Sequence, residues 1–178
     1  MGELTDHWVE LRSATPSHLR VRLVALGGAV LFMLALALAG GGGWVAWTGI
    51  VVMGGLTVLN PTTLMPTLFV VFGVASWWAG VEGPWHWALL PAALGLLAVH
   101  ASASLAASMP AQASVPGSVV QLWVVRTGIV AALTAGIWLL VALLAGIASP
   151  RGGAVPGIIG LVVLVAALVS VGRARQRA

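Results

Sequence analysis

Charged side chains occur at only a few places in this sequence, and long uncharged apolar stretches lie between them. No charged residue occurs between Arg22 and Glu82, between Glu82 and Arg126, between Arg126 and Arg151, or between Arg151 and Arg173. A helix that crosses the hydrocarbon core of a bilayer needs about 20 apolar residues. The apolar stretches are therefore divided into helices at the glycine, proline and asparagine residues that interrupt them.

Division at these breaks predicts an all-α polytopic integral membrane protein, a bundle of six membrane-spanning helices within residues 19–172. The predicted spans are residues 19–39, 44–59, 64–81, 88–107, 127–147 and 156–172. Residues 1–18 form a polar segment, either an interfacial helix with Leu4, Trp8 and Leu11 on one face or a frayed tail. Residues 119–125 are expected to lie along the membrane interface, and residues 173–178 form a basic tail.

The second predicted span is short. Residues 44–59 would make a helix of about 24 Å, less than the hydrocarbon core of about 30 Å. Asn60-Pro61-Thr62-Thr63 follows it and is predicted to be a tight turn. If residues 44–59 are re-entrant instead, Asn60 and Thr63 could line a polar site. The alternative fold is therefore four spans with re-entrant or interfacial segments.

The distribution of arginine favours six spans, because loops on the cytoplasmic side of a membrane are enriched in basic residues. Six spans place seven arginines on the cytoplasmic side: Arg12, Arg20, Arg22, Arg126, Arg173, Arg175 and Arg177. Arg151 alone is then outside, whereas five spans would place four arginines on each side. A four-span arrangement gives the same asymmetry only if residues 44–59 and 156–172 both fail to cross. Both termini are thus predicted to be cytoplasmic.

The tryptophans agree with this arrangement. Six of the nine would gather near the outer surface in the six-span arrangement, as in an aromatic belt. These are Trp44, Trp47, Trp77, Trp78, Trp85 and Trp87.

Composition excludes two broad classes of protein. Hydrophobic residues make up 60% of the chain and charged residues 7%, which is too little charge for a soluble domain and too apolar for a disordered chain. The net charge of +4 comes from a few arginines at span ends, so we expect a lipid bilayer and no nucleic acid as partner. The chain has no cysteine and no lysine. Lysine is absent whereas Ala, Gly, Val and Arg are abundant. This usage is typical of a gene with high GC content and indicates a bacterial origin, so we expect the membrane to be the plasma membrane.

One polar helical face is predicted inside the fourth span. His100, Ser104 and Ser108 recur at intervals of four residues. Because hydrocarbon cannot solvate polar groups, this face is expected to point into the bundle or a cavity. Hydrogen bonds between helices are the favoured role. A contact with a ligand or partner, or a proton relay, is an alternative.

A second candidate is a helix-packing face formed by Gly128, Ala132 and Gly136. Small residues at this spacing let another helix backbone approach closely. Packing within the chain is favoured over a homodimer interface.

No catalytic constellation, metal site or cofactor motif is recognised. Glu82 and His86 could contribute to a metal site, but they are interpreted as an interfacial anchor together with the neighbouring tryptophans. The sequence therefore predicts a non-enzymatic subunit or scaffold of a membrane complex, with a membrane protein or a second copy of this chain as its partner. A small channel or transporter for an uncharged or apolar solute is the alternative, and an enzyme acting on lipid is a third.

Overall fold

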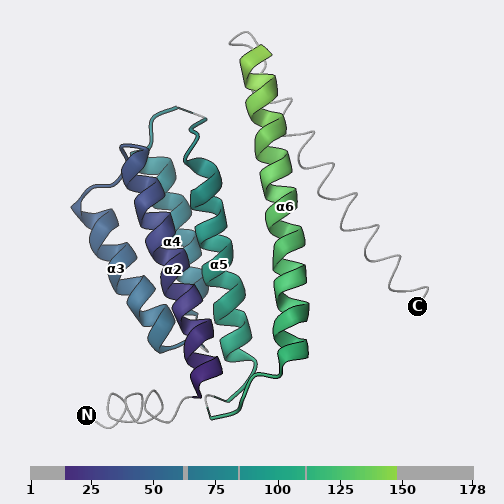
Figure 1. Cartoon of the computed structure of the whole chain (residues 1–178). Helices are drawn as coiled ribbons and strands as arrows, with labels where there is room; N and C mark the ends of the chain where they lie inside the picture. Colours follow the sequence, from purple (N-terminus) through teal and green to yellow (C-terminus); the bar gives the residue numbers. More distant parts are fainter. Residues whose placement is uncertain (1–14, 62–63, 84, 111, 148–178) are drawn as a thin grey trace. The chain divides into compact units, whose positions relative to one another are not determined.

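The computed structural model describes residues 15–61, 64–83, 85–110 and 112–147, and these residues form five α-helices (Figure 1). The helices are α2 (Pro16–Leu38), α3 (Trp44–Leu59), α4 (Met65–Gly80), α5 (Leu89–Ala107) and α6 (Gly117–Ile147). The chain divides into two compact units, Met1–Ile129 and Val130–Ala178, and each is considered by itself.

The all-helical prediction is confirmed for the described residues. Three helices are long and apolar enough to cross a membrane: Pro16–Leu38, Leu89–Ala107 and Gly117–Leu143. The helices α3 and α4 are apolar but have only 16 residues each. The six-span count is therefore not supported by the part of the chain that the structure describes. Residues 1–14, the predicted span 156–172 and the basic tail lie outside it.

The helices α2 and α6 both begin before the membrane spans predicted at residues 19–39 and 127–147. The α2 helix begins at Pro16 because the hydroxyl of Thr15 accepts a hydrogen bond from the backbone N–H of His18, which caps the helix. The α6 helix begins at Gly117, so the prediction that residues 119–125 lie along the interface is wrong. Nothing between Ser118 and Thr127 breaks a helix, and the apolar pattern simply continues.

The helices α2 to α5 form a bundle in which neighbours along the chain run in opposite directions (Figure 1). Besides its neighbour α3, α2 packs against α5, so the first and fourth helices of the bundle are joined side by side. We call the end that holds residues 40–43, 81–83 and 85–88 the tryptophan end. The opposite end holds the start of α2, the α3–α4 turn and the last turn of α5, and we call it the arginine end.

Two glycines bring α2 and α5 into backbone contact. A Cβ atom built on Gly28 would lie 2.7 Å from the carbonyl oxygen of Gly95, and one on Gly95 would lie 2.7 Å from the carbonyl oxygen of Gly28. Real side chains essentially never come so close, so both positions need glycine. Phe32 and Phe69 pack edge to face beside this contact, with ring centroids 6.2 Å apart. The buried apolar core comprises Ala29, Phe32, Ala35, Leu36, Ile50, Phe69, Ala88, Ala92 and Val99.

The four consecutive glycines after α2 form a tight connection to α3. Gly40 has a φ of +72°, and its N–H donates to the carbonyl of Ala37 while that of Gly41 donates to the carbonyl of Leu36. This is a Schellman motif, which satisfies carbonyls at the end of a helix and favours glycine at the position with positive φ. It turns the chain directly into α3 at the tryptophan end.

Candidate functional site

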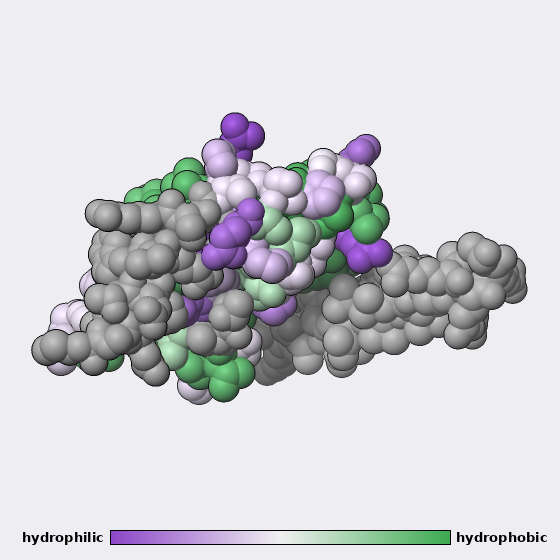
Figure 2. Space-filling view, turned by 90° about the horizontal axis from the view of Figure 1, so that it is seen from below, coloured by the Kyte–Doolittle hydropathy of each residue, from purple (hydrophilic) through white to green (hydrophobic). Residues whose placement is uncertain are grey.

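Four polar side chains are buried among the described residues: His18, Arg22, Thr57 and Ser102. They come from three helices, α2, α3 and α5. All four lie in the half of the bundle nearer the arginine end. Figure 2 looks onto this end, where hydrophilic residues gather and hydrophobic residues lie toward the rim.

His18 joins the first turn of α2 to the last turn of α5. Its Nε2 atom lies 3.1 Å from the carbonyl oxygen of Ala106. Because a carbonyl can only accept, Nε2 carries the proton and donates it to this bond. The Nδ1 atom is buried and has no hydrogen-bond partner among the described residues. The imidazole thus donates a hydrogen bond to one of the carbonyls that a helix leaves unsatisfied at its end.

Arg22 lies one helical turn after His18 and reaches the end of α3. Its Nη1 atom donates to the carbonyl oxygen of Leu59, the last residue of α3, over 3.3 Å. Its side chain is only 4% exposed. The carbonyl end of a helix carries a partial negative charge, so a guanidinium is well suited to it. The structure therefore gives Arg22 a contact with the end of a neighbouring helix, whereas the sequence predicted it only as a marker of the cytoplasmic side.

Two smaller side chains extend these contacts to the connection between α5 and α6. The hydroxyl of Thr15 donates to the carbonyl of Ala113 over 3.1 Å, and the backbone N–H of Val115 donates to the hydroxyl of Ser17 over 3.2 Å. Together with His18 and Arg22, these residues tie the start of α2 to the ends of two helices and to a loop. We call the four side chains, Thr15, Ser17, His18 and Arg22, the α2 clamp.

The α2 clamp is not among the sites predicted from the sequence. A usable signal was present, because His18 and Arg22 are four residues apart and therefore share a helical face. Thr15 and Ser17 flank Pro16, the first residue of the same helix. Which carbonyls they reach depends on contacts across 37 to 98 residues of sequence, and no local pattern encodes that distance.

The predicted polar face of α5 does not point into the bundle. His100 is exposed, and Ser108 is exposed at the end of the helix. The hydroxyl of Ser104 donates to the backbone carbonyl of His100, and that of Ser108 donates to the carbonyl of Leu105. The expectation that this face is buried is therefore wrong. The close contact at Gly95 turns the side of α5 that carries Ser102 toward α2 instead.

Gly128, Ala132 and Gly136 lie one above another along α6, and all three are exposed. The boundary between the two units falls within this series, so its packing within the chain stays a prediction. Of the other residues named as topology determinants, Arg20 and Arg126 are exposed. Arg12, Arg173, Arg175 and Arg177 lie outside the described residues.

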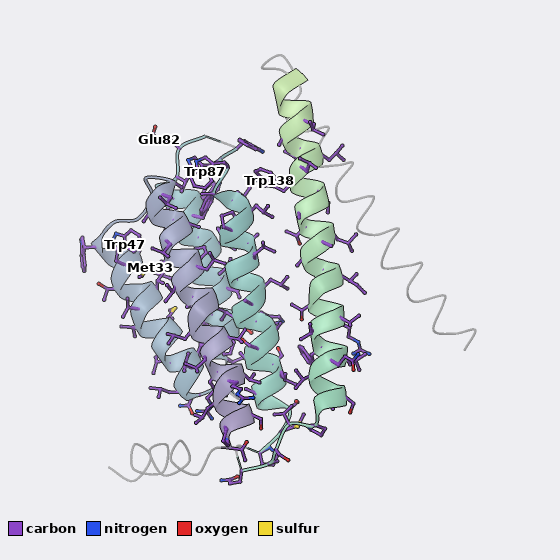
Figure 3. All side chains as sticks on the ribbon, viewed as in Figure 1. Met33, Trp47, Glu82, Trp87 and Trp138 are labelled. Atoms are coloured by element: carbon purple, nitrogen blue, oxygen red, sulfur yellow. The ribbon has the colours of Figure 1, made fainter. Side chains whose placement is uncertain are left out.

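Six tryptophans gather at the tryptophan end, as the sequence predicted, and Figure 3 labels Trp47 and Trp87 there together with Glu82. The imidazole of His86 packs beside the rings of Trp77 and Trp87, with centroid distances of 6.4 and 5.6 Å. Its Nδ1 atom accepts from the backbone N–H of Ala88 over 3.1 Å. Among the described residues, no three His, Cys, Asp or Glu side chains are grouped to hold a metal ion.

An open apolar groove of about 420 Å³ also lies at this end, between the start of α3 and the second half of α4. It is lined by Gly42, Gly43, Trp44, Val45, Ala46, Phe72, Ala75, Ser76, Ala79 and Gly80. Ser76 contributes the only hydroxyl among these lining residues.

Comparison with known proteins gives no match: no protein-family model fits the sequence, and neither a curated protein nor a solved structure is similar enough to be matched.

Proposed function

We propose that this chain is a small integral membrane protein that acts as a non-enzymatic subunit or scaffold of a membrane complex. The observation that supports this most directly is the use made of the buried polar side chains. His18 and Arg22 both bond to the backbone carbonyls that end neighbouring helices. Polar groups used in this way fix the positions of helices and leave their surfaces for contacts with partners.

The packing of the bundle supports the same proposal. Apolar side chains from α2, α3, α4 and α5 meet in its core, and the aromatic pair of Phe32 and Phe69 lies among them. A transporter needs a polar route for its solute, and close-packed apolar side chains oppose one along the bundle axis. The outer faces of the helices are rich in exposed leucine and valine, which suits contact with lipid and with other membrane helices.

We further propose that the arginine end faces the cytoplasm of a bacterial cell and that both termini lie on that side of the plasma membrane. Arg20 and Arg22 stand at the start of α2, whereas Glu82 and the exposed Trp44 and Trp78 belong to the other end. Basic residues are favoured on the cytoplasmic side, and tryptophan is favoured at membrane interfaces.

The test is purification of the tagged full-length chain from its native membranes in a mild detergent. We expect a membrane protein to co-purify at a fixed molar ratio, and its abundance to fall in cells that lack this chain. Single tryptophan substitutions on exposed faces map the contact: Leu23→Trp and Leu34→Trp on α2, and Val51→Trp on α3. These side chains are 63%, 53% and 62% exposed, so each substitution should preserve the bundle, and only those on the contact face should release the partner.

A different result would overturn the proposal. If the pure chain carries no partner and conducts an uncharged solute across liposomes, the scaffold proposal fails and the transporter alternative replaces it. Loss of binding by all three tryptophan variants would instead indicate general disruption, which a thermal unfolding measurement on each variant would reveal.

A further inference from the structure

We propose that α3 and α4 form a hairpin that enters the bilayer from the tryptophan end and stops more than one helical turn short of the level reached by α5. We propose that Arg22 holds this recessed end. The inference rests on membrane insertion, which is part of the proposed function, and adds to it a depth for each helix and a role for one buried cation.

Helix length is the first observation. The helices α3 and α4 have 16 residues each, whereas α2 has 23 and α5 has 19. At 1.5 Å per residue, a 16-residue helix is about 24 Å long. The hydrocarbon core is about 30 Å thick. Both helices of the hairpin are therefore too short to cross it without tilting, thinning the bilayer or ending inside it.

The contacts of α2 show at which end the hairpin is short. On α3, a Cβ built on Gly54 would lie 3.5 Å from the Cβ of Ala29, so these residues are level. On α5, a Cβ built on Gly28 would lie 2.9 Å from the Cβ of Ala98. Both helices run antiparallel to α2. The two contacts therefore fix their heights on a common scale.

All α-helices rise by about 1.5 Å per residue, so residue counts along α3 and α5 convert directly into heights. Leu59 ends α3 five residues after Gly54, which brings it level with residue 24 of α2. Ala107 ends α5 nine residues after Ala98, which brings it level with residue 19 of α2. The difference of five residues corresponds to about 7.5 Å along the bundle. The end of α3 is thus recessed relative to the end of α5.

Arg22 lies where such a recessed end needs a hydrogen-bond donor. Backbone carbonyls left unsatisfied in hydrocarbon cost several kcal/mol each, and an arginine inside the membrane is stable only when it is paired, for example with backbone carbonyls. The Nη1 atom of Arg22 donates to the carbonyl of Leu59. Thr57 and Pro61, on either side of that carbonyl along the chain, are buried. The guanidinium and the helix end therefore stabilise one another.

A recessed hairpin is compatible with the orientation of the rest of the chain. The helix α3 begins and α4 ends at the tryptophan end. If neither helix crosses fully, the chain still returns to that end before α5, so the directions in which α2 and α5 cross the membrane do not change. It also agrees with three helices being long enough to cross. The arginine count could not reveal this, because no arginine lies between Arg22 and Arg126. Incomplete crossing by both α3 and α4 therefore leaves every arginine on the same side as full crossing does.

The experiment measures depth with single cysteines, for which the cysteine-free chain is a natural background. Leu59→Cys and Ala107→Cys form a matched pair, because each replaces the exposed last residue of its helix. Each variant carries a bimane fluorophore in phosphatidylcholine vesicles, and lipids brominated at different acyl positions quench it. We expect the probe at residue 59 to lie deeper than the probe at residue 107 by about 5–8 Å, more than one helical turn.

Equal depths for the two probes would overturn the proposal. Val52→Cys, an exposed position near the middle of α3, is the control for insertion. If brominated lipid does not quench the probe at residue 52, the chain is not in the membrane, and it is the proposed function that fails. Quenching at residue 52 together with equal depths at 59 and 107 rejects only the recessed hairpin.

The role of Arg22 is tested in the Leu59→Cys chain. Arg22→Gln should move the probe toward the surface and reduce the difference in depth between residues 59 and 107 by at least half. Without the arginine, the carbonyls at the end of α3 are more stable where they can bond to water. Arg22→Lys, which can still donate, should keep more of the difference, and Arg20→Gln, at an exposed neighbour, should leave it unchanged. An unchanged depth in both Arg22 variants would show that Arg22 does not position the hairpin.

Discussion

Gly28 and Gly95 are the residues on which the contact between α2 and α5 depends. A Cβ atom added to either residue would lie 2.7 Å from the carbonyl oxygen of the other. The backbone cannot move aside as a flexible side chain can. Gly27 is adjacent in sequence, yet a Cβ there would meet nothing within 4 Å. The same amino acid thus has opposite roles at two consecutive positions, and only the packing distinguishes them.

The first prediction follows from this pair. Gly28→Ala should destabilise the protein by about 1–3 kcal/mol, because it overpacks a close helix contact. Gly27→Ala should be neutral or stabilise by up to about 1 kcal/mol through its higher helix propensity. Unfolding in mixed micelles with rising SDS measures the change in stability of both variants, and equal effects would contradict the close contact between Gly28 and Gly95.

A second prediction at the residue scale concerns His18. The side-chain nitrogen of glutamine can occupy roughly the place of the imidazole Nε2, whereas that of asparagine cannot reach it. His18→Asn should therefore cost about 1–3 kcal/mol by leaving the carbonyl of Ala106 unsatisfied. His18→Gln should cost clearly less in the same unfolding assay. If the two variants are equally unstable, the bond to Ala106 is not what His18 contributes.

At the scale of the elements, the ends of the helices are determined by different means. A threonine cap and a proline start α2, and the Schellman motif at Gly40 ends it. His18 and Arg22 bond to the ends of α5 and α3 through long-range contacts. The first kind of boundary can be predicted from neighbouring residues, and the second kind cannot.

Gly40→Ala tests the local kind. A side chain at a φ of +72° is strained by about 1–2 kcal/mol, and the stability of the protein should fall by that amount. Gly55→Ala is the control, since a Cβ there would meet nothing within 4 Å and the residue lies inside α3. Thermal unfolding of the two purified variants gives the comparison. A Gly40→Ala variant as stable as Gly55→Ala would argue against this turn.

At the scale of the whole molecule, the two ends of the bundle differ in chemistry. The arginine end holds the α2 clamp and the exposed Arg20, and the tryptophan end holds Glu82, His86 and six tryptophans. Because basic residues resist transfer across the membrane, this difference predicts a single orientation.

Reporter fusions test that orientation. A fusion after Gln112 should be active only as a cytoplasmic reporter, and fusions after Gly42 and Gly83 should both be active only as external reporters. The two external positions flank the α3–α4 hairpin, so their agreement is expected whether or not the hairpin crosses fully. A cytoplasmic signal after Gly83 would contradict the orientation.

The sequence alone determined that the chain is helical and apolar enough for a membrane, because helix length and hydrophobicity are local properties that 16 to 31 consecutive residues carry by themselves. It also placed the tryptophans at one end, since the spacing of the turns fixes which loops lie together. It wrongly predicted that His100, Ser104 and Ser108 lie on the buried side of α5, whereas the structure has Ser102 there.

Only the tertiary structure decided which side of each helix is buried, because an apolar helix in a membrane protein has no polar face that would settle it from the sequence. In this chain the decision depends on the absence of a side chain at Gly28 and Gly95. That contact joins two residues more than sixty positions apart in the sequence. The burial of His18 and Arg22 depends in the same way on where distant helices end, a property of the assembled bundle and not of the residues around them.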